Sequence, residues 1–242
     1  MKDTVFTLLS NKEIAKNTYE WVLDGDTKGI RAGQFVNIKL DGFYLRRPIS
    51  VCDCKESTLT LIFKVVGDGT QKMSEAREGE EFRVLTGLGN GYNLAKSGHA
   101  PLLIGGGAGV PPMYLAARLL AERGIVPTVI LGFNTAREVF YKEKFEELGC
   151  KVYVTTVDGS AGIKGFVTDA MAGLDYTYFY TCGPLPMLRA VYNASLTDGE
   201  LSFEERMGCG FGACMGCSCE TKYGYKRICR DGPVLTKEEV KW

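Results

Sequence analysis

Apolar and polar residues alternate in short segments over the first hundred positions, as expected for strands with one buried and one exposed face. Turns rich in glycine, aspartate and lysine separate these segments. Several strands at this spacing predict a small antiparallel barrel or sandwich. The predicted strands occupy residues 4–14, 17–24, 33–40, 59–67 and 80–88.

The pattern changes near residue 99, where short apolar strands begin to alternate with helical segments. The first helical segment opens with two prolines and closes with a glycine, which is typical of helix ends. Alternating strands and helices predict a doubly wound parallel sheet. The predicted strands are 101–106, 126–133, 151–159 and 177–183, and the predicted helices are 111–124, 138–149 and 186–196.

Periodicity is lost after about residue 200, where glycine and cysteine dominate the run MGCGFGACMGCSC. Such a segment has little apolar surface, so we expect it to be organised by whatever its cysteines bind. The sequence therefore predicts an α+β multidomain protein. Its parts are an antiparallel β-barrel over 1–98, a doubly wound α/β nucleotide-binding domain over 99–200 and a small cysteine-rich segment over 201–242.

Charge and composition narrow the possible partners. The 29 Lys and Arg residues balance 29 Asp and Glu, so the chain has no basic excess that would favour nucleic acid or anionic lipid. The N-terminus carries scattered charges and lacks the apolar region of a signal peptide, so we expect a cytoplasmic protein. The longest run without Asp, Glu, Lys or Arg, 97–117, contains five glycines and three prolines, and we expect no membrane span.

Five of the nine cysteines lie between positions 209 and 229, which indicates a metal centre rather than disulfides. Cys209, Cys214 and Cys217 have the spacing CxxxxCxxC, and Cys229 follows after eleven intervening residues. This is the plant-type 2Fe-2S spacing. The intervening glycines can turn backbone N–H groups toward sulfur and offset the negative charge of a cluster. We therefore predict that these four cysteines bind a 2Fe-2S cluster.

A structural zinc site and free thiols are the alternatives, because four thiolates also suit tetrahedral zinc. Zinc sites usually combine two CxxC pairs, and this segment has one. Cys219 is close enough in sequence to replace Cys229 as the fourth ligand. We prefer Cys229, since closure by a distant cysteine is the plant-type arrangement.

Two motifs in the first hundred residues suit a flavin nucleotide. In LRRPISV, Arg47 offers a fork for a phosphate and Ser50 can hydrogen-bond the edge of a flavin ring. In KVVGDGT, the glycines would let backbone amides approach a pyrophosphate. Each motif alone also fits an edge strand or a hairpin turn. The candidate contacts are Arg47, Pro48, Ile49, Ser50, Lys64, Val65, Val66, Gly69 and Thr70.

A glycine-rich turn, GGGAGVPP, follows a predicted strand and opens a predicted helix, which is an arrangement suited to binding an anion. It departs from the GxGxxG pattern at Val110. The run TCGP ends a later strand, and a buried inert thiol is the alternative role for its cysteine. The candidate nicotinamide-nucleotide contacts are Gly105, Gly106, Gly107, Gly109, Pro112, Cys182, Gly183 and Pro184.

The segment GFNTARE follows the second strand of this domain, where a nucleotide ribose is usually recognised. It offers Asn134, Thr135, Arg137 and Glu138, which could serve either a ribose hydroxyl or a 2′-phosphate. The choice between NAD and NADP is therefore open at this level.

Together with GQFV at 33–36, these motifs resemble the FAD-binding barrel and nucleotide domain of the ferredoxin-NADP reductase superfamily. Arg47 and Ser50 match its Arg-x-Tyr-Ser motif, and Ile49 stands where the tyrosine usually lies against the flavin. The superfamily also places a cysteine and a glycine equivalent to Cys182 and Gly183 beside the nicotinamide. The resemblance implies bound FAD and catalytic positions for Ser50 and Cys182.

The C-terminal run ERMGCGFGACMGCSCETKYGYKRICRDGPVL is similar to the electron-transfer subunits of dihydroorotate dehydrogenase B, and the other motifs agree over the whole length. The resemblance implies FAD, one 2Fe-2S cluster and NAD as electron acceptor. A flavin is needed because hydride carries two electrons and the cluster accepts one. The resemblance also implies a role in pyrimidine biosynthesis, with a separate FMN-containing catalytic subunit that oxidises dihydroorotate, in a heterotetramer of two of each.

Phe211 and Met215 in the cysteine loop are expected to face that catalytic subunit. An alternative is the electron-transfer subunit of another NAD(P)H-linked oxidoreductase, of the ferredoxin:NADP oxidoreductase or hydrogenase diaphorase type. A binding module stabilised by zinc, in which the nucleotide motifs are structural, is an alternative from a different class.

Overall fold

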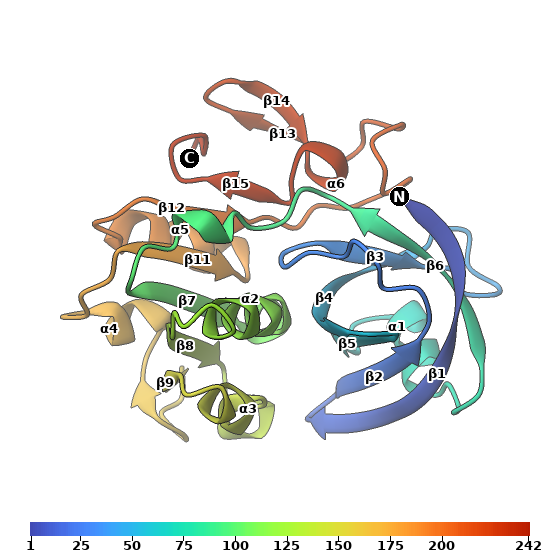
Figure 1. The fold of residues 1–242 in the computed structure, drawn as a ribbon, viewed down its shortest axis with the longest axis horizontal. Helices are drawn as coiled ribbons and strands as arrows, with labels where there is room; N and C mark the ends of the chain where they lie inside the picture. Colours follow the sequence, from blue (N-terminus) through green and yellow to red (C-terminus); the bar gives the residue numbers. More distant parts are fainter.

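The computed structural model describes all 242 residues and contains two bodies that pack side by side (Figure 1). The first body is a closed barrel of antiparallel strands in the order β1-β2-β5-β4-β3-β6, which confirms the predicted barrel. Its strands are β1 (Lys2–Ala15), β2 (Thr18–Asp24), β3 (Phe35–Ile38), β4 (Arg47–Lys55), β5 (Thr58–Lys64) and β6 (Glu81–Leu88).

The interior of the barrel is filled by the alternate apolar residues that the sequence pattern predicted, among them Phe6, Trp21 and Val36, none of which is exposed. A short helix, α1 (Asp68–Ser74), follows β5 where only a glycine turn was expected. The Thr70 hydroxyl explains its start, because it accepts hydrogen bonds from the backbone N–H groups of Val66 (2.9 Å) and Gly67 (3.2 Å).

The second body is a seven-stranded sheet in the order β10-β9-β8-β7-β11-β12-β15. All neighbours are parallel except β12 and β15. Its strands are β7 (Pro101–Gly106), β8 (Thr128–Phe133), β9 (Lys151–Thr156), β10 (Ile163–Lys164), β11 (Tyr178–Cys182), β12 (Gly199–Ser202) and β15 (Val234–Thr236). The predicted doubly wound sheet is confirmed.

Helices cover both faces of this sheet (Figure 1). On one face, α2 (Pro111–Ala121) and α3 (Lys142–Glu147) share a hydrophobic core with the barrel. On the other lie α4 (Val167–Met171) and α5 (Leu185–Ala194). α3 begins later than predicted because Tyr141 has a left-handed backbone (φ 67°), which does not continue a helix.

The C-terminal segment contains more regular structure than its sequence suggested. It forms the hairpin β13 (Ser218–Thr221) and β14 (Gly224–Arg227), the short helix α6 (Ile228–Asp231) and then β15. β15 pairs with β12, so the predicted division at residue 200 falls inside the sheet. Asn90 also holds the segment, since its Nδ2 donates to the carbonyl of Val234 at 2.7 Å. The expectation that the cysteines alone organise this segment is thus corrected.

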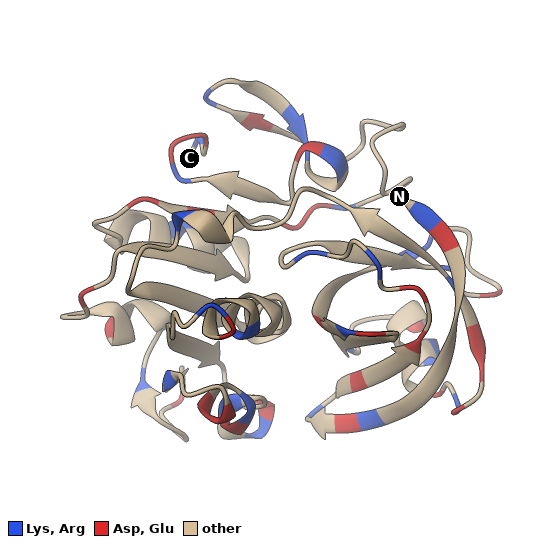
Figure 2. Cartoon of the chain, in the orientation of Figure 1, with Lys and Arg blue, Asp and Glu red and all other residues tan.

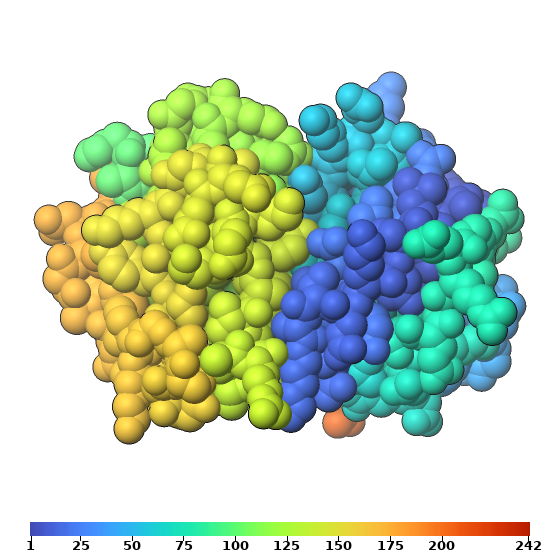
Figure 3. Space-filling view, turned by 90° about the horizontal axis from the view of Figure 1, so that it is seen from below, coloured from blue at the N-terminus to red at the C-terminus, as the bar shows by residue number.

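Polar contacts join the barrel to the sheet domain. Lys64 pairs with Glu138 at 2.8 Å, and Arg118 pairs with Asp53 at 2.9 Å. In Figure 3 the blue residues of β1 and β2 lie directly against the yellow-green residues near 130–140. Acidic and basic residues are interspersed over both bodies (Figure 2). None of the helices combines the length and apolar character that a membrane crossing requires.

Candidate functional site

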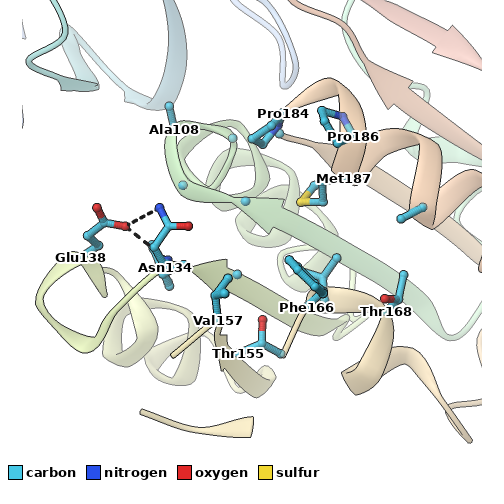
Figure 4. A pocket seen from close by; sticks show the side chains of 18 of the residues that line it. Ala108, Asn134, Glu138, Thr155, Val157, Phe166, Thr168, Pro184, Pro186 and Met187 are labelled. Atoms are coloured by element: carbon cyan, nitrogen blue, oxygen red, sulfur yellow. Dashed lines mark hydrogen bonds between the residues drawn. The ribbon is translucent and has the colours of Figure 1, made fainter. Parts of the chain in front are cut away.

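A cavity of about 660 Å³ lies at the carboxyl ends of β7, β8 and β11, where ligands bind in open α/β sheets. Figure 4 shows the side chains of Ala108, Asn134, Pro184 and Met187 around it. Among the predicted nucleotide contacts, five of the glycine and proline residues line this cavity. They are Gly106, Gly107, Gly109, Gly183 and Pro184.

Two glycines of the turn lie too close to neighbouring segments to carry a side chain. A Cβ on Gly109 would lie 2.1 Å from the carbonyl oxygen of Cys182, and a Cβ on Gly106 would lie 2.3 Å from the sulfur of Met187. Bare backbone therefore forms the wall of the cavity just before α2 begins at Pro111. Pro111 and Pro112 carry no N–H, so the approachable backbone of the glycine turn, rather than the first turn of α2, suits a dinucleotide phosphate.

Three predicted contacts lie behind this wall rather than in it. Gly105 is the penultimate residue of β7, Pro112 is buried in the first turn of α2, and Cys182 is fully buried. Burial raises the pKa of the Cys182 thiol, so the thiol is neutral and is not suited to exchange a proton at neutral pH. A catalytic role for Cys182 stays a prediction, and its position suits packing beneath the nucleotide.

An ion pair between the two bodies closes one end of the cavity. Lys64 from β5 and Glu138 both line it, and Glu138 also accepts hydrogen bonds from the backbone and side chain of Asn134 at 3.2 and 3.1 Å (Figure 4). The hydrogen bond from Lys64 holds the pKa of Glu138 below its usual value. Lys64 is the only basic residue that lines the cavity, and Arg137 does not line it.

The structure brings the two flavin motifs together at one end of the barrel. The Arg47 side chain lies over the Phe43 ring at 4.6 Å and against the first turn of α1. A Cβ on Gly69 would lie 1.9 Å from Arg47 Nε, so only glycine permits this approach. A guanidinium beside the free N–H groups of a first helical turn makes a fitting site for a phosphate.

The other predicted flavin contacts lie around this point. Pairing with β3 places Pro48 opposite Asn37 and Ser50 opposite Phe35, on the outer face of the barrel. Ile49 packs against the larger hydrophobic core. Val65 is half-buried, while Val66 is 81% exposed and has no packing role that would compete with ligand contact. These assignments fit a flavin site and stay predictions.

The four predicted cluster ligands lie together as two pairs. Backbone N–H groups of Ala213 and Cys214 donate to Cys209 Sγ at 3.2 and 3.4 Å, and the N–H of Cys209 donates to Cys214 Sγ at 3.5 Å. In the second pair, the N–H of Cys229 donates to Cys217 Sγ at 3.4 Å. Two thiols for each of two iron atoms is what a 2Fe-2S cluster requires.

Zinc would need all four thiolates around a single ion, whereas the two pairs offer two thiols to each iron of a 2Fe-2S cluster. Burial alone would raise the pKa of Cys209, but hydrogen bonds from the backbone of Cys214 and Phe211 lower it to about 6. Burial and the neighbouring Cys217 raise the pKa of Cys229 to about 12. Cys219 stands opposite Lys226 in the β13–β14 hairpin, outside both pairs.

Several residues around the cavity were missed by sequence reasoning. Met187, Ala190 and Glu204 line it, although none belongs to a recognised motif. Glu204 lies five residues before Cys209, the first cysteine of the loop. The chain therefore passes along the cavity wall just before it enters the cysteine loop. A signal was available only for Met187, which lies three residues beyond the predicted Pro184 in the first turn of α5.

Comparison with known families matches two parts of the chain. Residues 103–193 match the oxidoreductase NAD-binding domain. Residues 204–241 match the iron-sulfur cluster binding domain of dihydroorotate dehydrogenase B. The second match contains all four of the paired cysteines.

The chain is also similar to curated proteins over nearly its full length. Proteins named dihydroorotate dehydrogenase B (NAD(+)), electron transfer subunit, are 44% identical in Fusobacterium nucleatum and 45% identical in a Geobacillus species. Each alignment covers 99% of both proteins.

Among solved structures, a chain of an NADH-dependent reduced ferredoxin-NADP oxidoreductase is 30% identical, with a TM-score of 0.89 over 99% of this chain and 90% of that one. A ferredoxin NADP+ reductase from Neisseria gonorrhoeae shares the fold, with a TM-score of 0.67 at 16% identity over 80% of this chain and 90% of that one.

Proposed function

Because the chain belongs to the family of dihydroorotate dehydrogenase B electron transfer subunits, we propose that it carries electrons from a dihydroorotate-oxidising FMN subunit to NAD in pyrimidine biosynthesis. Electrons pass through the 2Fe-2S cluster and FAD on the way. The observation that carries this proposal is the agreement over 99% of the chain, with the four cysteines paired inside the family's cluster domain.

FAD, when bound, supplies the exchange between single electrons from the cluster and the two-electron hydride of NADH. The chain's own residues hold and orient the groups. Arg47 and the first turn of α1 would take the FAD phosphates, and the turn from Gly106 to Gly109 would take those of NAD. Gly183 and Pro184 form the opposite wall.

NAD rather than NADP is favoured by the charges around the cavity. A 2′-phosphate needs a free cation, and the one lysine that lines the cavity is already paired with Glu138. Glu138 and Asn134 instead suit ribose hydroxyls, and a carboxylate repels a 2′-phosphate.

The cluster would be bound by Cys209, Cys214, Cys217 and Cys229, with Cys219 as a bystander. We propose that residues 1–98 serve FAD, residues 99–200 serve NAD and residues 201–242 serve the cluster, although β15 returns to the sheet. Phe211 (44% exposed) and Met215 (56% exposed) offer apolar contacts for the catalytic subunit. A heterotetramer with two copies of each subunit is part of the proposal.

The test is reconstitution with the FMN-containing subunit encoded in the same organism. We expect the purified complex to reduce NAD with dihydroorotate, and the isolated chain to oxidise NADH with an artificial acceptor but not to oxidise dihydroorotate. Protein purified without oxygen should contain FAD, iron and acid-labile sulfide. Zinc in place of iron would refute the assignment.

The likeness to the ferredoxin-NADP oxidoreductase chain supports a second candidate, an electron-transfer subunit for a different partner. Its identity of 30% is lower than the 43–45% shared with the dihydroorotate dehydrogenase B subunits, which is why we rank it second. Copurification with a ferredoxin-dependent subunit and no dihydroorotate activity would favour it.

A further inference from the structure

Asn37 lies between the flavin motif and the cysteine loop, and neither the family resemblance nor the predicted motifs give it a role. It belongs to β3, where Val36 and Ile38 point into the barrel core and Phe35 joins the core beneath the C-terminal segment. Since alternate residues share a face of a strand, Asn37 points out of the barrel with Phe35. Its side chain is only 1% exposed.

On one side, Asn37 adjoins the flavin motif. β3 and β4 are antiparallel, and the register places Asn37 directly opposite Pro48 and Phe35 directly opposite Ser50. Opposite residues in an antiparallel pair share a face, so Asn37 lies on the same face as Pro48 and Ser50. The backbone carbonyl of Asn37 also accepts a hydrogen bond from Arg46 at 3.4 Å.

On the other side, Asn37 meets the cysteine loop. A Cβ on Gly210 would lie 2.0 Å from Asn37 Nδ2, so the amide nitrogen occupies the space where a side chain would stand. Gly210 has φ +78° and lies between Cys209 and Cys214. The loop that carries the first cysteine pair thus rests on the Asn37 amide.

The amide is also incompletely satisfied. Asn37 Oδ1 is buried without a hydrogen-bond partner, and its surroundings are apolar, including Leu85 opposite it in β6. Buried polar groups of this kind are rare, because they are costly to keep. A leucine would fill the position at no such cost, so the amide calls for a functional explanation.

We propose that Asn37 is a positioning residue of the electron path, which rests on the proposed cluster. Its amide holds the Cys209–Cys214 loop against the flavin-bearing face of the barrel, and its N–H stabilises the added negative charge of the reduced cluster. N–H groups near a cluster raise its reduction potential in this way. The three atoms nearest to a Cβ on Gly210 all belong to Asn37.

The test is the cluster reduction potential of Asn37→Leu in the full chain with FAD and cluster, measured by redox titration and the electron paramagnetic resonance signal of the reduced cluster. Leucine keeps the size of the side chain but removes the N–H. We expect the equilibrium between reduced and oxidised cluster to shift approximately tenfold toward the oxidised form. For a one-electron couple this corresponds to a reduction potential about 59 mV lower. Asn37→Asp should lower the potential at least as much. An unchanged potential in Asn37→Leu would overturn the proposal.

Asn90→Leu is the matched control, because Asn90 holds the same segment through Val234 but not the turn at Gly210. Its cluster potential should stay at the wild-type value, and an equal fall would show general loosening and overturn the proposal. If Asn37→Leu cannot retain a cluster, Asn37→Ser, which keeps a donor, must restore it with an intermediate potential. Failure to do so counts against the proposal.

Failure of the proposed function can be told apart from failure of the proposal for Asn37. Wild-type protein without iron and acid-labile sulfide would remove the cluster itself. Wild-type protein with a cluster, beside an Asn37→Leu protein of equal potential, would remove only the role of Asn37.

Discussion

Replacing Gly109 by alanine should force the glycine turn away from β11. The added Cβ would stand 2.1 Å from the carbonyl oxygen of Cys182 and 2.6 Å from the backbone nitrogen of Gly183, whereas ordinary contacts begin at 3.4 Å. Both neighbours are backbone atoms, one in the last residue of β11 and one in the residue that follows it, so no rotation of a side chain relieves the overlap. The turn and the strand must separate.

Overpacking of this kind costs about 1–3 kcal/mol, and we expect the upper end because only backbone can move. A loss of about 3 kcal/mol lowers the melting temperature of a chain of this size by roughly 6–12 °C. Because the displaced turn forms the cavity wall, the KM for NADH should also rise by at least about tenfold, which is ~1.4 kcal/mol of lost binding.

Gly107→Ala is the matched control in the same turn. Gly107 has φ +52°, so alanine is strained there by about 1 kcal/mol, but a Cβ would meet nothing within 4 Å. The assays are thermal unfolding and NADH oxidation with ferricyanide as acceptor. If the two variants melt at the same temperature with the same KM, the close approach of this turn to β11 does not shape the site.

Three further outcomes are expected. Cys229→Ser should lose the cluster absorbance and iron, whereas Cys219→Ser should keep both; the reverse would exchange their roles. Arg47→Ala should lower FAD content by more than half after gel filtration, and full retention would contradict a phosphate contact. Lys64 lowers the pKa of Glu138, so the pair stabilises above the unfolded pKa near 4.5 and the gain is lost as pH falls through the lower folded value. Glu138→Gln should therefore lower the melting temperature at pH 7 but not at pH 3.

The sequence was sufficient to predict elements and motifs that are formed by one contiguous segment of the chain. Alternation of apolar residues predicted five of the six barrel strands but not β4, and the change of period near residue 99 predicted the doubly wound sheet. The CxxxxCxxC spacing identified three thiols within nine residues, because a single loop places them. The glycine turn was identified for the same reason, since its strand, turn and helix are contiguous.

Contacts between distant segments could not be predicted in this way. Lys64 and Glu138 are 74 residues apart, and nothing near either one indicates the other. Asn37 looks like an ordinary polar residue of a strand until Gly210 is placed beside it. The return of β15 to the sheet was missed because three residues, Val234–Thr236, carry too short a pattern to predict a strand.

That return explains how a segment rich in glycine can hold a cluster. β12 and β15 are neighbours in the sheet, and Phe203 N–H donates to the Pro233 carbonyl at 2.9 Å, so residues 203–233 form a loop whose base is already closed. The entropy of closing this loop is offset by sheet pairing rather than by iron binding alone. It follows that Cys229→Ser can lose the cluster while keeping β15 and the nucleotide cavity, and therefore NADH oxidation by ferricyanide. A variant that lost both together would show that the cluster, and not the sheet, closes the loop.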